Sequence, residues 1–160
     1  MAKSNRTKPS SSLALNQEFN ATETNLSALF DATDELIVLI SEDGTILTLN
    51  RVAAKHIGYP AEALIGKKIS EVFPPDLISR HRPYVDQMLE TGEPCFFEVS
   101  RNDRWFYNRI FPTIDENGKI VRMAVYTRDI TDERIAKNAL IQSEEKYRRQ
   151  ILELLIPKFI

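Results

Sequence analysis

One histidine stands where it could hold a metal-bearing cofactor. His81 lies in residues 76–90, a stretch with helical spacing that ends before Gly92 and Pro94. On that helix it would share one face with Leu77, Tyr84, Val85 and Met88. A neutral imidazole directed into an apolar pocket is what an axial haem-iron ligand requires, so haem is a candidate cofactor. The alternative is a partly buried histidine bonded to a backbone carbonyl.

A second chemical hypothesis concerns anion binding. Arg101 ends one predicted strand, and Asn108 and Arg109 lie in the next. The planar guanidinium group offers a bidentate fork to a carboxylate, so these residues could meet an anionic ligand. The alternative is that they are sheet-surface residues that pair with Glu98 and its neighbours. Asn50 is expected to bond to backbone, and His56 to be solvated.

The composition is that of an ordinary globular chain. Its 160 residues are 42% hydrophobic and 28% charged, and the net charge of −2 gives no reason to expect nucleic acid as a partner. The single cysteine, Cys95, excludes an intrachain disulfide and is expected to be a small buried residue. No secretion signal and no apolar run of membrane-spanning length is present, so we expect a cytoplasmic location.

The chain is predicted to have three parts. Residues 1–21 are polar and predict a disordered arm. Residues 22–131 form the folded domain, beginning with a short helix that Thr22 or Thr24 could cap. Residues 132–160 form a C-terminal helix. The apolar side chains of the first helix, which we expect to lie on the domain or on a partner chain, are Leu26, Leu29 and Phe30.

Within the domain the pattern predicts two strands, then helices, then three more strands. Residues 36–49 indicate a hairpin around Asp43-Gly44. Short helices follow, broken at Gly58-Tyr59-Pro60, at Gly66 and at Pro74-Pro75, and Pro83 could kink the longest of them. The last three strands are predicted at residues 95–101, 104–114 and 119–130. This order predicts an α+β fold in which one five-stranded antiparallel sheet carries short helices on one face.

The C-terminal helix has a weak heptad pattern. Leu140, Tyr147 and Leu154 recur every seven residues, and Ile151 adds a second apolar position late, because Lys137 and Glu144 hold its earlier equivalents. The pattern favours a parallel two-chain coiled coil and hence a homodimer through the N- and C-terminal helices. The alternative is a single helix that packs back on its own sheet.

Four segments together resemble the PAS family of sensor domains, in its S-box subset. They are "LIVLISEDGTILTLN", "AAKHIGYPAEALIGKKISEVFPP", "LETGEP" and "YTRDITDERIA". The resemblance covers roughly residues 25–134 and implies a sheet order of 2-1-5-4-3. It also implies a ligand between sheet and helices, or no ligand and dimerisation alone. The exit signal of the family resembles Asp129, Ile130 and Thr131, followed by Glu133 and Arg134.

The resemblance also bears on the cofactor, whose identity the sequence leaves unknown. In the rhizobial haem oxygen sensors a histidine, a tyrosine three residues later and a strand arginine occupy the places of His81, Tyr84 and Arg101. The strand before that arginine is glycine-rich there, whereas here Phe97 or Glu98 could fill the space of the porphyrin. A flavin is not expected, because residues 70–73 replace the cysteine motif of the flavin photosensors.

The C-terminal tail suggests a missing output domain. Residues 155–160, around Pro157, resemble the linker into a class III adenylate or guanylate cyclase, and a sensor histidine kinase is the competing parent. No catalytic constellation is visible, so the chain is not expected to be an enzyme. We therefore expect a PAS sensory module that dimerises and passes a ligand- or redox-linked signal to an output domain. The alternatives are a ligand-free dimerisation scaffold and a haem-based gas sensor.

Overall fold

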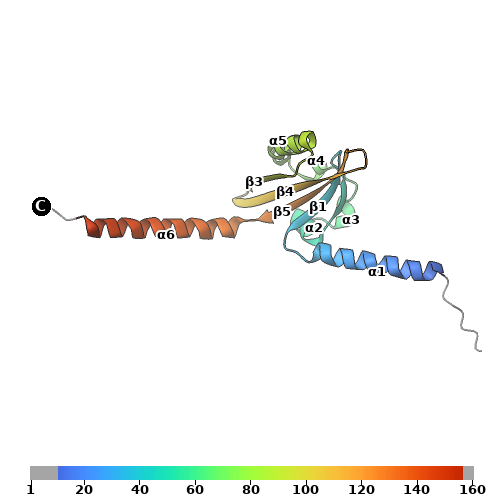
Figure 1. Ribbon diagram of the computed structural model, residues 1–160, viewed down its shortest axis with the longest axis horizontal. Helices are drawn as coiled ribbons and strands as arrows, with labels where there is room; N and C mark the ends of the chain where they lie inside the picture. The colour runs from blue at the N-terminus through green and yellow to red at the C-terminus, as the bar shows by residue number, and fades with distance from the viewer. Residues whose placement is uncertain (1–10, 157–160) are drawn as a thin grey trace, which may run out of the picture.

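The computed structural model describes residues 11–156. An antiparallel sheet with short helices forms the body of the molecule, and a long helix extends from it at each end (Figure 1). The N-terminal helix is α1 (Ser11–Asp31), and the C-terminal helix is α6 (Thr131–Leu155). Residues 1–10 of the expected arm and residues 157–160 of the expected linker lie outside the described residues.

The sheet confirms the predicted fold class and strand order. Its strands are β1 (Leu36–Ser41), β2 (Ile46–Leu49), β3 (Cys95–Arg101), β4 (Arg104–Ile114) and β5 (Ile120–Asp129). They pair antiparallel in the order β2-β1-β5-β4-β3. The turns occur where the sequence predicts them: Gly44 has φ +81°, and Asn102 and Asp103 also adopt positive φ.

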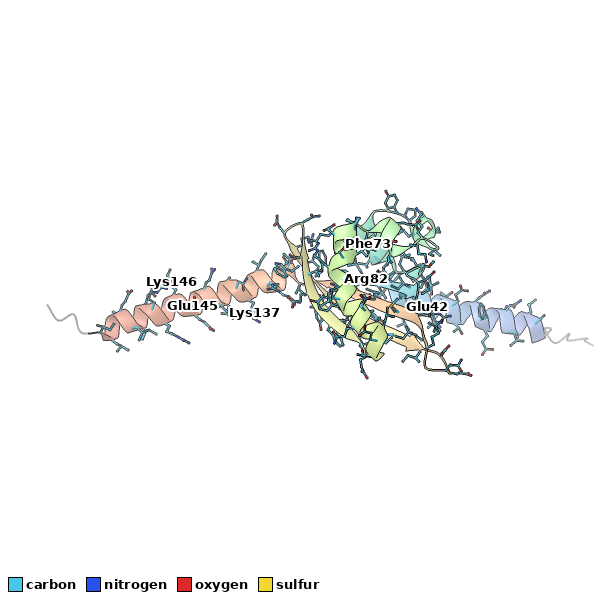
Figure 2. All side chains as sticks on the ribbon, turned by 90° about the horizontal axis from the view of Figure 1, so that it is seen from above. Glu42, Phe73, Arg82, Lys137, Glu145 and Lys146 are labelled. Carbon is cyan, nitrogen blue, oxygen red and sulfur yellow. The ribbon has the colours of Figure 1, made fainter. Side chains whose placement is uncertain are left out.

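Four helices between β2 and β3 cover one face of the sheet. They are α2 (Arg51–Ile57), α3 (Ala61–Leu64), α4 (Ile69–Val72) and α5 (Pro75–Thr91), and the predicted breakers separate them. Gly58, for example, ends α2 in the left-handed conformation that glycine adopts most readily. α5 runs through Pro83 without a break, and Figure 2 shows it lying across the sheet.

The core lies between these helices and the inner face of the sheet. Alternate residues of β4 point inward, so Phe106, Asn108 and Ile110 are buried. The helices contribute the fully buried Ala53, Leu64 and Met88. Alternate residues along the strands thereby form one apolar layer, in which Asn108 in the middle of β4 is a polar exception.

The N-terminal helix begins earlier than predicted. Residues 11–21, expected to belong to a disordered arm, are helical, because no glycine or proline interrupts the chain from Ser11 to Asp31. Leu15 and Phe19 also extend the apolar stripe of Leu26 backwards at helical spacing. Thr22 and Thr24 do not cap the helix, since both hydroxyls donate to the carbonyl four residues earlier.

Both long helices leave the body with their apolar side chains exposed. Leu26 and Leu29 are exposed, and Phe30 is half-buried at the end of α1. No residue of α6 is buried; Leu140, Tyr147 and Leu154 are 61%, 65% and 86% exposed. α6 points away from the sheet (Figure 1), so it does not pack back on its own domain. None of the helices in residues 11–156 is long and apolar enough to cross a membrane.

Candidate functional site

A cavity of about 480 Å³ lies between the sheet and helices α2, α4 and α5. This volume lies within the usual range of small-molecule sites. Its floor consists mainly of inward-facing side chains of the central strands, among them Leu36, Val38, Ile110, Met123 and Val125. Phe73, Arg82 and Glu42, all in its wall, are labelled in Figure 2. The enclosure is mostly apolar, with a few polar groups at defined positions.

Asn108 is the polar group in the middle of the floor. Its side chain is 2% exposed, and its Oδ1 accepts a hydrogen bond of 2.8 Å from the Thr127 hydroxyl on β5. Its Nδ2 is buried and has no hydrogen-bond partner among residues 11–156. A buried donor without a partner costs about 1–3 kcal/mol, so this position is poorly explained by stability alone.

His81 lines the same cavity from α5. Its Nε2 is buried without a hydrogen-bond partner in the described part of the chain, so the bond to a backbone carbonyl that the alternative predicts is absent at this atom. Burial, and next the charge of Arg80, lower the pKa of His81 to about 4. The imidazole is therefore neutral at pH 7 and leaves a second polar atom of the cavity unsatisfied.

The residues around His81 do not fit a haem. The His81 Nε2 has the chemistry of an axial ligand, but the buried Phe97 packs edge-on against its ring with centroids 5.0 Å apart. Tyr84 stacks flat on Phe97 at 4.1 Å and does not line the cavity. The structure thus brings His81, Arg101 and Asn108 to one cavity but leaves Tyr84 out of it. β3 is poor in glycine, and its Phe97 occupies the space beside His81 that a haem macrocycle would need.

The other predicted anion ligand lies on the opposite face of the sheet. Arg109 forms an ion pair with Glu35, and its guanidinium lies 5.4 Å from the ring centroid of Tyr126. Glu98, expected as a partner of these arginines, pairs with Arg134 instead. The reason is strand alternation, which directs Asn108 inward and Arg109 outward.

Several polar residues of the cavity wall were not among the predicted site residues. His56 is exposed, as expected, and it also lines the cavity, with its ring centroid 5.6 Å from that of Phe106. Burial lowers the pKa of His56, and so do the charges of Arg101 and Arg104. Thr127 and Arg82 also line the cavity. Thr127 is recognised as a cavity residue only from its pairing with Asn108 across β4 and β5, and local sequence patterns do not predict which residues pair across strands.

Cys95 shows no sign of a reactive thiol. It lies partly buried at the start of β3, and burial raises the pKa of its thiol.

The junction between β5 and α6 is densely bonded. Asp129 Oδ1 accepts hydrogen bonds from the Thr131 amide and hydroxyl, at 3.0 and 2.6 Å. The Trp105 amide on β4 donates to the Thr131 hydroxyl, and its carbonyl accepts from the Ile130 amide. Burial favours the protonated Asp129, but the bonds from Thr131 and the charge of Arg104 outweigh it and lower the pKa of Asp129. The first residue of α6 is therefore fixed to both β4 and β5.

The first turns of α6 are also held by ion pairs. Arg134 pairs with Glu98 of β3, and its guanidinium lies over the Trp105 ring, 3.8 Å from the centroid. Glu133 pairs with Arg128 of β5. These contacts connect the start of α6 to three strands of the sheet.

Asn50 has the structural role that the sequence predicts. Its Oδ1 accepts from the Ile37 and Ala53 amides, at 3.0 and 2.9 Å. Its Nδ2 donates to the Phe30 and Glu35 carbonyls, at 3.2 and 2.9 Å. One buried side chain thus connects the end of α1, the start of β1 and the N-terminus of α2.

Comparisons with known proteins agree with this fold. A family model described as "PAS fold" matches residues 30–135. Among solved structures, a PAS domain from Colwellia psychrerythraea is 22% identical, with a TM-score of 0.58 over 69% of this chain and 98% of that one. A domain of an HTR-like protein from Haloarcula marismortui is 25% identical, with a TM-score of 0.54 over 62% of this chain and all of that one.

Two further proteins are similar to this chain. A sensory box sensor histidine kinase from Vibrio cholerae is 18% identical, with a TM-score of 0.56 over 73% of this chain and 98% of the solved chain. An uncharacterised protein of Azorhizobium caulinodans is 28% identical in an alignment 125 residues long, and this match covers 71% of this chain and 16% of that protein. The chain therefore spans about a sixth of the length of this curated relative.

The sheet order, the covering helices and the family match lead to one assignment. The chain belongs to the PAS fold family, whose members are sensory, non-catalytic modules of signal transduction.

Proposed function

We propose that this chain is a cytoplasmic, ligand-binding PAS sensor. As a homodimer, it passes the state of its cavity through α6 to an output domain. The observation that carries the proposal is the apolar cavity in which Asn108 Nδ2 and His81 Nε2 are buried without hydrogen-bond partners from the described residues. A ligand that bonded to them would remove the cost of two unsatisfied polar atoms.

A short path connects the cavity to α6. Phe106 lines the cavity and pairs with Asp129 across β4 and β5. Its neighbour Trp105 bonds to Ile130 and Thr131 through its backbone and lies under the guanidinium of Arg134. A shift of Phe106 on ligand binding would therefore move groups that hold the start of α6. Typical allosteric systems of this kind couple two sites by about 1–3 kcal/mol.

Dimerisation is supported by the exposed apolar stripes. Leu140, Tyr147 and Leu154 lie on one side of a helix that buries none of its residues. Figure 2 shows polar side chains such as Lys137, Glu145 and Lys146 projecting from the same helix with no other element beside them. An isolated helix of this kind gains stability when a second copy covers its apolar face.

The output domain in the parent protein is proposed to be a histidine kinase or a nucleotide cyclase. The similar PAS structure from a sensor histidine kinase supports the first. The resemblance of residues 155–160 to a cyclase linker supports the second. In either case the chain itself contributes regulation rather than catalysis.

The proposal is tested by sedimentation or light scattering over a hundredfold dilution, together with mass spectrometry of small molecules released from the purified chain. We expect a dimer and a released organic compound. A dimer that never carries or binds a small molecule would instead indicate a ligand-free scaffold, and a monomer at every concentration would contradict signalling through α6.

A further inference from the structure

The charges around the cavity are unequally neutralised. The acidic side chains in its wall are occupied: Glu42 pairs with Lys119 at 3.0 Å, and Asp43 pairs with Lys68. Ser41 and Thr45 also donate hydrogen bonds to Asp43. These carboxylates therefore offer little to a cationic ligand.

Arg101 is the contrasting group. It lines the cavity at the end of β3, is half-buried, and has no carboxylate partner within residues 11–156. Its cross-strand neighbour Arg104 is neutralised by Asp129, and Arg82 faces Asp86 at 3.9 Å. Arg101 thus supplies a positive charge to the cavity that no acidic group of the described chain balances.

The two histidines of the wall add no charge. The pKa of His81 is about 4, and burial also lowers the pKa of His56. At pH 7 the fixed, unpaired charge of the cavity is therefore the guanidinium of Arg101. Asn108 Nδ2 also lacks a partner among the described residues, and as an amide nitrogen it can only donate hydrogen bonds.

An apolar surface separates these two donors. Arg101, Val99 and Phe97 alternate toward the same face of β3, and Phe97 lies opposite Asn108. At about 3.3 Å per strand residue, Arg101 and the Asn108 row lie roughly 13 Å apart along the sheet. Val99 and Phe106 line the cavity between them.

We propose that the ligand of this cavity is a mostly apolar monocarboxylic acid whose carboxylate binds Arg101, and whose body extends over the apolar floor and brings a hydrogen-bond acceptor to Asn108 Nδ2. This inference rests on the proposed ligand-binding function. A guanidinium–carboxylate pair in a partly dry site is a charge-assisted, bidentate interaction, and the apolar body supplies the remaining binding energy.

The test is calorimetric titration of the full chain with octanoate and with octanamide, which have the same apolar tail and differ in charge. We expect octanoate to bind at least about tenfold more tightly than octanamide, because hydrogen bonds to charged groups are the stronger ones. Arg101→Gln should remove this preference, and Arg101→Lys should restore part of it. Arg122→Gln, an exposed arginine outside the cavity, is the matched control and should leave the preference intact.

The outcomes separate the two proposals. Equal binding of octanoate and octanamide, or a preference that survives Arg101→Gln, would overturn the carboxylate assignment and leave the cavity as a ligand site. Binding of neither compound would overturn the carboxylate assignment, and if the released-molecule search is also empty, the ligand-binding function fails with it.

Discussion

Two buried asparagines in this domain are used in opposite ways. Asn50, 1% exposed, makes four hydrogen bonds with four different backbone groups at the junction of α1, β1 and α2. Asn108, 2% exposed, accepts one bond from Thr127 and leaves its Nδ2 without a partner. Folding alone explains the first position, whereas the second leaves a donor available to the proposed ligand. The start of α6 and the cavity differ in the same way: the first is densely bonded, whereas the second contains polar atoms without hydrogen-bond partners among the described residues.

Replacing Asn50 by leucine is expected to have the largest effect. Asn50→Leu removes all four hydrogen bonds and leaves backbone groups of Ile37, Ala53, Phe30 and Glu35 without this partner. The free energy of unfolding should fall by roughly 2–4 kcal/mol, measured by urea denaturation at fixed protein concentration. If Asn50→Leu lowers the free energy of unfolding by no more than Asn108→Leu does, the two asparagines do not differ in structural role.

Acid should destabilise the domain through His81. Its folded-state pKa of about 4 lies below the ordinary value of 6.5, so the unfolded chain binds the proton more tightly. Stability should therefore be full above about pH 6.5 and should fall as the pH drops toward 4, by at most about 3 kcal/mol. Urea midpoints between these pH values measure the slope, and His81→Gln should flatten it. An unchanged slope in that variant would show that other groups dominate this pH range.

Removing Arg134 tests how firmly the start of α6 is held to the sheet. Arg134→Gln deletes the ion pair with Glu98 and the contact with the Trp105 ring, both at a partly exposed site. We expect about 1 kcal/mol of destabilisation and faster amide hydrogen exchange in the first turns of α6. Lys137→Gln, one turn further along the exposed helix, is the control and should change neither quantity. Exchange that is equally slow in both variants would contradict the role of Arg134.

Asn108→Leu should have the smallest effect on stability. It removes an unpaired buried donor, and the new side chain is of similar size and suits the apolar floor. The Thr127 hydroxyl loses its acceptor, so the expected net change is within about 1 kcal/mol, measured by the same urea titration as for Asn50→Leu. A loss of several kcal/mol would mean that Asn108 is structural after all.

Local sequence signals predicted the framework well and the cavity only in part. The turns at Gly44 and Gly58 and the capping of α2 by Asn50 follow from rules that act within a few residues. The cavity depends on side chains from distant strands. Strand alternation directs Asn108 and Arg109 to opposite faces of the sheet. The packing of α5 on β3 places Phe97 beside His81. Local spacing treated Tyr84 as a neighbour of His81 in the pocket, but Tyr84 turns out of it to stack on Phe97.

The most direct test of the account asks whether the cavity controls the helix. Hydrogen exchange of the full chain should be measured at increasing octanoate concentration, following the cavity strands β4 and β5 together with the first turns of α6. We expect exchange to slow in both regions with the same midpoint concentration. Slowing confined to the strands, or no change anywhere up to saturating octanoate, would contradict a link between an acid-binding cavity and α6.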